Sequence, residues 1–227
     1  MINLLYQDNH LLVVNKPALL PTMGVGQRET SLIVQAKAYL KKKHSKPGNV
    51  YLGVVSRLDA MVSGVIVLAK TSKAASRLTD QFRERQVRKT YWAVVHRPLP
   101  RSEATLHNWL VKDDRARRMR VCPAATVGAL EAQLSYRTLQ AMGQRQLLGI
   151  ELITGRKHQI RVQLAHLDRP ILGDKKYGSQ QPFPTGIALH SRVLSLIHPV
   201  TKESQTFVAP VPPCWLRLGI DQGDLRP

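Results

Sequence analysis

One carboxylate in an unusual setting is Asp59, in the string SRLDAMVSG between two apolar runs of the chain. A carboxylate that leaves water needs a partner, and Arg57 stands two residues before it. If this backbone is extended, both side chains point to the same side, so the guanidinium can keep Asp59 ionised at neutral pH. An ionised carboxylate can act as a nucleophile. A structural ion pair that ties a turn is the competing interpretation, and these residues alone favour it.

A second group of polar residues follows Gly155, in the string TGRKHQIRVQLAHLDRPILGDKKYG. Cations at a helix N-terminus oppose the helix dipole, so we expect a carboxylate or a phosphate in the same space. His158 and Arg161 share a helix face that can point at an acidic site. Taken by itself, His158 is more typical of a hydrogen-bonded structural histidine. The basic residues at the start of the predicted helix are Arg156, Lys157, His158 and Arg161.

A third group is Lys89-Thr90-Tyr91, which opens a predicted strand directly after a basic helix end. An aromatic ring between cations suits stacking on a nucleic-acid base. A core tyrosine with a satisfied hydroxyl is the alternative, and the spacing does not separate the two interpretations.

The segments that must position these groups show no regular alternation of strand and helix. Apolar periodicity and turn residues predict helices over residues 31–44, 72–85 and 157–167. Many strands and few helices predict an α+β fold, with a mainly antiparallel mixed sheet flanked by a few helices. The predicted strands are a pair around Asp8-Asn9 within 3–16, and single strands at 50–55, 65–69, 89–95, 132–139, 146–153, 187–197 and 205–208.

The domain organisation expected from the sequence is simple. We expect one catalytic domain over residues 1–227, because no linker or low-complexity tract interrupts the apolar runs. Residues 101–128 contain a cluster of arginines and are predicted to form a basic hairpin insertion. Residues 210–227 are expected to form a loose C-terminal tail that begins with a Pro-rich stretch.

The charge balance indicates the kind of partner. The 227 residues contain 34 Lys and Arg but 15 Asp and Glu, a formal net charge of +19. Such an excess costs self-repulsion unless a polyanion offsets it, so nucleic acid is the expected partner and an acidic membrane surface the alternative. Aromatic residues make up 5%, which argues against an array of base-stacking platforms.

Composition also excludes several classes of protein. No apolar run approaches the ~20 residues of a membrane span, and the N-terminus lacks the pattern of a secretory signal. Cys122 and Cys214 lack C-x-x-C spacing, so neither a disulfide framework nor a zinc site is predicted, and we expect the chain in the cytoplasm. The acids nearest to Asp59 in sequence are Glu29 and Asp80, which argues against a hydrolase with paired carboxylates and a metal-dependent nuclease.

Together the three strings resemble the RluA-type family of RNA pseudouridine synthases. In that family Arg-Leu-Asp, followed by Ser-Gly, carries the catalytic aspartate and Lys-x-Tyr the active-site tyrosine. A third motif, Gly-Arg-x-His-Gln-Ile-Arg, carries a basic residue that pairs with the aspartate. Here the motifs stand in the same order, as RLDAMVSG at 57–64, KTY at 89–91 and GRKHQIR at 155–161. The resemblance extends from YQDNHLLVVNKP near the N-terminus to LHSRVLSLIHPVT at 189–201.

The resemblance implies a pseudouridine synthase-like fold and an isomerase that converts specific uridines of structured RNA, ribosomal or transfer, to pseudouridine. It implies no cofactor, no metal and no membrane association. Asp59 is the implied catalytic residue, with Tyr91 and Arg161 beside it. The oligomeric state is left open, with a monomer favoured. The residues implied in substrate binding are Lys89, Arg156, His158 and Arg57, the last of which would fill the gap left by a flipped nucleotide.

Two residues depart from the family pattern. Ser56 and Val62 stand where the family usually has His and Thr. We interpret these changes as altered loop packing or altered substrate choice, because Asp59, Tyr91 and Arg161 are intact. A catalytically silent RNA-binding protein on the same scaffold is the alternative function. The family's opening string already begins near residue 6, so no S4-type RNA-binding domain is expected before it.

Overall fold

The computed structural model describes residues 2–24, 30–45 and 48–220 of the chain. It divides the chain into two compact units, Met1–Arg88 with Ser191–Val211 and Lys89–His190 with Pro212–Pro227. The first unit holds β1 (Leu4–Gln7), β2 (Leu11–Lys16), α1 (Leu32–Lys43), β3 (Gly53–Val54), β4 (Ser63–Ala69), α2 (Ser72–Arg83), most of β10 (Leu189–Ile197) and β11 (Ser204–Val208).

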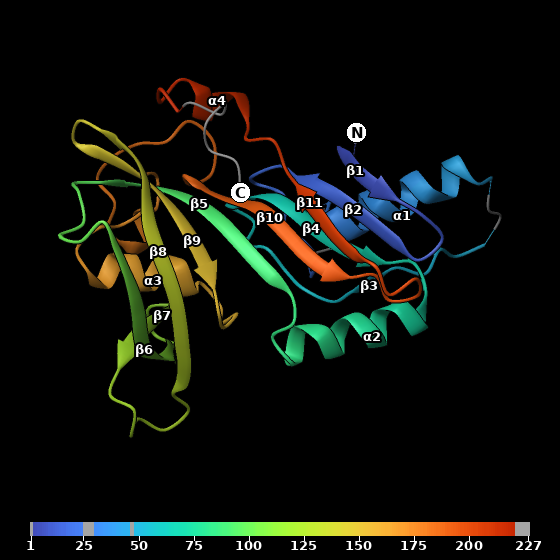
Figure 1. The fold of residues 1–227 in the computed structure, drawn as a ribbon, viewed down its shortest axis with the longest axis horizontal. Coiled ribbons are helices and arrows are strands. Elements are labelled where there is room, and N and C mark those ends of the chain that lie inside the picture. Colours follow the sequence, from blue (N-terminus) through green and yellow to red (C-terminus); the bar gives the residue numbers. More distant parts are fainter. Residues whose placement is uncertain (1, 25–29, 46–47, 221–227) are drawn as a thin grey trace. The chain divides into compact units, whose positions relative to one another are not determined.

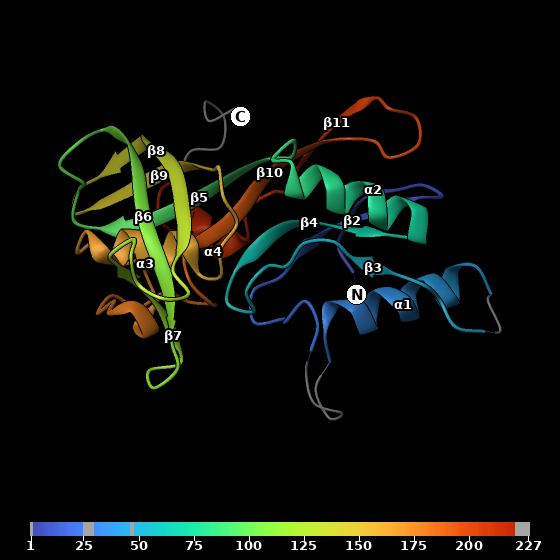
Figure 2. The same ribbon diagram turned by 90° about the horizontal axis from the view of Figure 1, so that it is seen from below.

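The central strands β2 and β4 of the first unit's sheet are buried on both faces. Its strand order is β1-β2-β4-β10, with β11 beside β10 and β3 beside β4. Because successive side chains of a strand point to opposite faces, the run LLVV of β2 serves two cores. Leu11 and Val13 pack with α2, whereas Leu12 and Val14 pack with α1. Figure 2 shows these two helices on opposite faces of the sheet.

The two helices of this unit begin differently. Thr71 caps α2, because its hydroxyl accepts a hydrogen bond of 3.2 Å from the backbone N–H of Ala74. Ser31 is the residue before α1, and its side chain makes no capping bond. Burial of Leu32, Ala36 and Leu40 on one face holds α1 instead.

The second unit contains a long antiparallel meander. Its elements are most of β5 (Arg88–His96), β6 (Glu103–Asp113), β7 (Arg118–Cys122), β8 (Leu130–Met142), β9 (Arg145–Leu152), α3 (Gln159–His166), the 3-10 helix η1 (Lys175–Tyr177) and α4 (Pro213–Leu216). The strand order is β5-β9-β8-β6-β7, and all four pairs are antiparallel. Figure 1 shows β8 and β9 as long neighbouring strands.

A small core joins α3 to this meander. Val162 of α3 packs with Leu110 of β6, Met119 of β7, Ala132 of β8 and Tyr177 of η1. These residues come from five elements, so the position of α3 depends on all of them. The consequence for function is that the helix carrying Arg161 is fixed by a core that includes the base of the β6–β7 hairpin.

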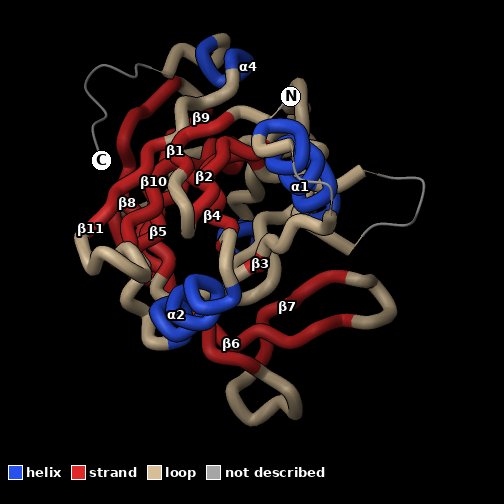
Figure 3. Tube along the Cα trace, turned by 90° about the vertical axis from the view of Figure 1, so that its right-hand side faces the viewer, coloured by secondary structure: helices blue, strands red, loops and turns tan. Residues whose placement is uncertain are grey.

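The β6–β7 hairpin carries the arginine cluster of the sequence. Asp113 of β6 lies opposite Arg118 of β7 in the strand register. The Asp113 carboxylate accepts a hydrogen bond of 2.9 Å from the N–H of Ala116 in the turn. Figure 3 shows β6 and β7 side by side. The exposed basic residues of this hairpin are Lys112, Arg115, Arg117, Arg118 and Arg120.

The α+β class predicted from the sequence is confirmed, and several boundaries need correction. The strand predicted at 50–55 is reduced to Gly53–Val54, and β8 runs beyond the predicted 132–139. The helix predicted at 157–167 begins later, because His158 adopts a left-handed backbone with φ of 55°. Only the three long helices were predicted; η1 and α4 were not.

The C-terminal segment is partly described. Residues 213–216 form α4, and Trp215 is 1% exposed, with the ring of Phe183 packed edge-on against it at 5.9 Å. Residues 221–227 of the predicted tail lie outside the described residues. The domain boundaries expected from the sequence stay predictions.

Candidate functional site

Asp59 lies in the loop that joins β3 to β4 of the first unit. The loop turns sharply after it, because the Val62 N–H donates a hydrogen bond of 3.1 Å to the Asp59 carbonyl oxygen. Asp59 is half-buried, whereas Val62 is 2% exposed. An apolar side chain therefore fits the Val62 position, where a threonine would bury a hydroxyl.

Thr22 fastens this loop from a distant part of the chain. Its hydroxyl donates to the carbonyl oxygen of Leu58 at 2.9 Å and accepts from the Leu58 N–H at 3.2 Å. Both backbone groups of the residue before Asp59 are thus satisfied by one side chain. Thr22 itself is 3% exposed, so these two hydrogen bonds are shielded from water.

Lys16 supports the same loop from the end of β2. Its side chain is 0% exposed, and its ammonium donates to the carbonyl oxygens of Pro17, Leu20 and Ala60 at 2.9, 2.8 and 3.4 Å. Burial lowers the pKa of Lys16 to about 8, and the negative charge of Asp59 acts in the opposite direction. Lys16 therefore links the chain after β2 to the Asp59 loop through its hydrogen bonds to backbone carbonyl oxygens.

Arg57 does not play the part that its spacing suggested. It is exposed, and no ion pair between Arg57 and Asp59 occurs in the part of the chain that the structure describes. Within this unit, the buried Lys16 is a cation whose charge interacts with that of Asp59. The exposed guanidinium of Arg57 can instead reach a molecule in solution.

In the second unit, β5 carries the Lys-x-Tyr motif. Tyr91 is 9% exposed and lies opposite Ile150 of β9. The ammonium of Lys89 lies 3.7 Å from the point that a Cβ on Gly155 would occupy. The start of β5 and the GRKHQIR segment are therefore neighbours within this unit.

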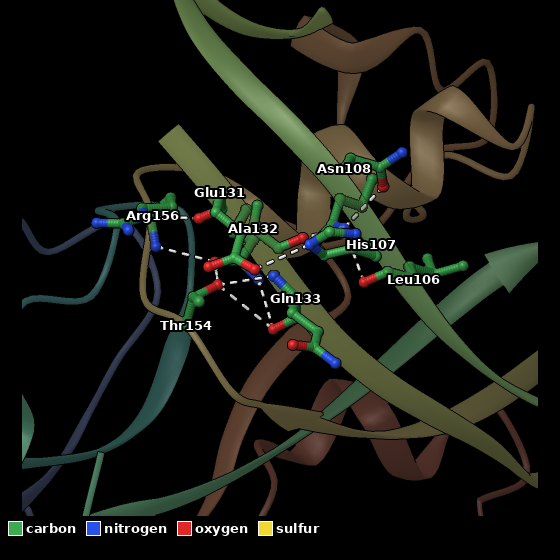
Figure 4. A network of polar contacts seen from close by, with 10 residues as sticks. Leu106, His107, Asn108, Glu131, Ala132, Gln133, Thr154 and Arg156 are labelled. Carbon is green, nitrogen blue, oxygen red and sulfur yellow. Dashed lines mark hydrogen bonds and ion pairs between the residues drawn. The ribbon is translucent and has the colours of Figure 1, made fainter. Parts of the chain in front are cut away.

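Gln159 shapes the segment that carries Arg156. Its amide oxygen accepts hydrogen bonds from the Arg156 N–H at 2.9 Å and the Thr154 hydroxyl at 2.7 Å, and its amide nitrogen donates to the carbonyl of Gln133. The Arg156 Nε donates to the carbonyl of Glu131 at 2.8 Å. Figure 4 shows this network between the segment and β8. The hydrogen bond from Nε to the Glu131 carbonyl oxygen fixes the position of the Arg156 side chain.

Arg161 is a buried cation with a buried partner. It is 4% exposed, and its Nε and Nη2 atoms donate to Asp174 Oδ2 and Oδ1 at 2.7 and 2.8 Å. Asp174 is 1% exposed. A bidentate pair of this kind is the arrangement that a buried guanidinium requires. Asp174 thus supplies the negative charge expected near the basic helix start.

His158 and Arg161 both contact Tyr177. The His158 Nδ1 atom lies 2.8 Å from the Tyr177 hydroxyl oxygen, and the two rings meet edge-on. The Arg161 guanidinium carbon lies 5.0 Å from the centre of the same ring. The structure therefore brings together two of the predicted residues of this unit around a tyrosine that is 7% exposed.

Three residues of this arrangement were missed by sequence reasoning, namely Lys16, Asp174 and Tyr177. Lys16 stands two residues after the apolar run LLVV and directly before a proline, and a lysine at the end of a buried strand is a usable signal. Asp174 and Tyr177 stand in the string GDKKYG, where Asp and Tyr after a glycine offered a weaker signal.

Within residues 2–24, 30–45 and 48–220, no group of three or more His, Cys, Asp or Glu side chains is placed to hold a metal ion. Among the helices in the described part of the chain, none is long and apolar enough to cross a membrane. Both cysteines, Cys122 and Cys214, are free thiols.

Comparison with known proteins gives a consistent result. Residues 10–166 match the family described as RNA pseudouridylate synthase. Ribosomal large subunit pseudouridine synthase D of Xylella fastidiosa is 37% identical over 227 residues, which cover 93% of this chain and 66% of that protein. Ribosomal large subunit pseudouridine synthase C of Buchnera aphidicola is 32% identical over 224 residues, which cover 92% of this chain and 67% of that protein.

A solved structure agrees with these sequences. Human RNA pseudouridylate synthase domain containing 4 matches with a TM-score of 0.80 and 28% identity, over 95% of this chain and 91% of that one. The chain therefore belongs to the RNA pseudouridylate synthase family. It spans 66% of the length of the Xylella relative. The family resemblance drawn from the three motifs is confirmed.

Proposed function

We propose that this protein is an RNA pseudouridine synthase that isomerises uridine in structured RNA through Asp59. The observation that carries the proposal is the Asp59 loop, a half-buried carboxylate on a tight turn that Thr22 and Lys16 hold in place. Membership of the family supports the same reaction. A buried cation beside an aspartate favours the ionised form that such chemistry needs.

The reaction requires no electron acceptor. The N1–C1′ bond of the uridine breaks, the uracil turns, a C5–C1′ bond forms and the proton on C5 moves to N1 through solvent or a base. Atoms and electrons balance within one nucleotide, so no redox cofactor is required. Asp59 acts as the nucleophile, at the sugar or at the base, or stabilises the positive ribosyl intermediate.

The other predicted site residues receive roles in this proposal. The Tyr91 ring stacks on the uracil, and the positive charge of Arg161 favours the ionised form of the catalytic carboxylate. The target base must leave its stack, which costs a few kcal/mol. Arg57, exposed two residues before Asp59, takes the place of the flipped base. Lys89, Arg156 and His158 bind the RNA around the site.

The substrate is proposed to be ribosomal RNA. The names of two relatives refer to the large ribosomal subunit, which favours ribosomal over transfer RNA. The net charge of +19 fits any structured RNA. An RNA substrate and two free thiols favour the cytoplasm. The protein is proposed to act as a monomer without a cofactor or a metal.

Tritium release from RNA labelled at C5 of uridine tests the reaction directly. Wild-type protein is expected to release tritium, and Asp59→Asn is expected to retain less than about a tenth of the rate, because an amide is no nucleophile. RNA affinity should stay within a few-fold of wild type. Asp80→Asn, which alters an exposed acid paired with Arg83, is the matched control and should keep full activity.

Two results would contradict the proposal. Tritium release by Asp59→Asn at the wild-type rate would remove Asp59 from the reaction. RNA binding by wild-type protein without any release would favour the catalytically silent RNA-binding alternative. Mapping of pseudouridine across total RNA, from cells with wild-type protein and cells with Asp59→Asn, then identifies the modified uridine and decides between ribosomal and transfer RNA.

A further inference from the structure

Leu19 combines an unfavourable backbone conformation with an exposed apolar side chain. It lies between β2 and α1, has φ of 65° and is 59% exposed. A left-handed backbone costs conformational energy in any residue with a Cβ, and a bulky residue there is an outlier. Eight non-glycine residues in the described part of the chain have a positive φ, and Leu19 is the only apolar one among them.

The fold itself gains little from a leucine at this position. Exposed apolar side chains are common and by themselves indicate no site. Among the described residues of the first unit, however, Leu19 is the most exposed large apolar side chain, so core packing does not offset its strained backbone. A glycine would adopt the same φ without strain. A strained residue that the fold does not need indicates a use for its side chain.

The backbone on both sides of Leu19 is anchored. The Lys16 ammonium donates to the carbonyl oxygens of Pro17 and Leu20, at 2.9 and 2.8 Å, and so closes the turn that contains Leu19. Leu20 is 7% exposed and packs in the core beneath α1. Leu19 is therefore presented to solvent by a turn that is held at both ends.

This turn is connected to the Asp59 loop. The same Lys16 ammonium donates to the Ala60 carbonyl oxygen at 3.4 Å, and Thr22, just beyond the turn, bonds to both backbone groups of Leu58. The two residues that flank Asp59 are thus bonded to side chains that flank the Leu19 turn. The exposed leucine and the proposed catalytic loop belong to one connected part of the first unit.

The surroundings indicate what Leu19 contacts. Arg57 is exposed in the same Asp59 loop, and the net charge of +19 favours a polyanion. When a uridine leaves its stack, an adjacent base loses a stacking partner. Leucine is among the apolar side chains that proteins place against unstacked bases. We propose that Leu19 is a substrate-binding residue that packs against the face of an unpaired base adjacent to the target uridine. This role rests on the proposed function.

Protein stability provides the first test. Leu19→Gly should raise the urea midpoint and lower the equilibrium constant for unfolding about fivefold, because glycine adopts this backbone without strain. Ser45→Gly is the matched control. Ser45 is exposed, has φ of 48° and lies at the end of α1 opposite to the Leu19 segment, so its replacement should give a similar gain. A lower midpoint for Leu19→Gly than for wild type would show that the side chain serves the fold, and would overturn the inference.

RNA binding provides the second test, by filter binding of an in vitro transcript of large-subunit ribosomal RNA. Leu19→Gly should weaken the affinity about five- to tenfold, as expected for loss of a buried leucine contact. The salt slope should stay at its wild-type value, because an apolar contact releases no counterions. Leu19→Met should keep the affinity within about twofold of wild type, and Ser45→Gly should leave it unchanged. Wild-type affinity in Leu19→Gly, or a reduced salt slope, would overturn the inference.

The two proposals fail in different ways. Absence of tritium release by the wild type would contradict the proposed function, and the binding measurement on Leu19→Gly would still report whether this side chain contacts RNA. Normal release by the wild type together with wild-type RNA affinity in Leu19→Gly would contradict only the role of Leu19.

Discussion

The Arg161 guanidinium binds the Asp174 carboxylate through two hydrogen bonds, of 2.7 Å from Nε and 2.8 Å from Nη2. Both side chains are almost completely buried. The charge of Arg161 therefore has a buried carboxylate partner within its own unit. This arrangement places the cation without requiring the substrate.

The first prediction concerns the stability of this pair. Asp174→Asn leaves the Arg161 charge buried without its carboxylate, so the free energy of unfolding should fall by about 3–5 kcal/mol. Urea unfolding followed by circular dichroism measures the change. Asp80→Asn breaks an exposed pair with Arg83 and should cost less than about 1 kcal/mol. Equal losses in the two variants would contradict the burial argument.

The second prediction uses the lowered pKa of Lys16. Its pKa is about 8 in the folded protein, against an ordinary value of 10.5. Between these values the unfolded chain binds the proton and the folded chain does not, so the free energy of unfolding rises with pH in this window. From about pH 8 to about pH 10.5, Lys16 should contribute a gain of about 3 kcal/mol.

Lys16→Met isolates this contribution. The difference in unfolding free energy between wild type and Lys16→Met should increase across the window, because only the wild type titrates at this position. Urea unfolding at several pH values from 7.5 to 11 provides the measurement. Lys37→Met, at an exposed lysine of α1, is the control and should give a difference independent of pH. A flat difference for Lys16→Met would contradict the prediction.

The third prediction concerns Gly64 at the start of β4. A Cβ at this position would lie 2.2 Å from the carbonyl oxygen of Ser191, and the φ of +119° already disfavours other residues. Gly64→Ala should therefore lose more than about 3 kcal/mol of stability, or fail to fold. Gly128→Ala, with φ of +76° and open space around it, should lose about 1–2 kcal/mol. Thermal and urea unfolding compare the two, and similar losses would contradict the close approach of the backbones.

The fourth prediction concerns the β6–β7 hairpin. If its exposed arginines bind phosphates, RNA affinity should fall steeply with salt, with a log–log slope of about −4 for roughly six phosphates. Replacing Arg115, Arg117 and Arg118 with Gln should reduce this slope and weaken binding to all RNAs alike. The single-turnover rate at saturating RNA should stay nearly unchanged, because phosphate contacts position the substrate.

The control for the hairpin variant removes the same charge elsewhere. Arg97, Arg101 and Arg137 are exposed arginines of the same unit, near the beginning of β6 and not at its hairpin turn. Their replacement with Gln should leave the salt slope closer to wild type, when both triple variants are measured by filter binding at several salt concentrations. If the hairpin variant kept the wild-type salt dependence of RNA affinity, the hairpin arginines would not contact the RNA phosphates.

Much of the molecule follows from local pattern in the sequence. The runs LLVV and VIVLA predicted buried strands because a strand covered on both faces needs apolar residues throughout. Helical spacing of Leu32, Ala36 and Leu40 predicted α1. The strings around Asp59, Tyr91 and Arg161 indicated the family, because each motif combines several residue types in a fixed order.

The partners of the site residues were decided only by the tertiary structure. Arg161 meets Asp174 13 positions away, the Lys16 ammonium reaches Ala60 44 positions away, and Met119 meets Tyr177 58 positions away. Periodicity records which side chains share a face of one element, but it contains no information about which elements pack together. Spacing therefore favoured Arg57 as the partner of Asp59, whereas chain packing placed the buried Lys16 at that loop.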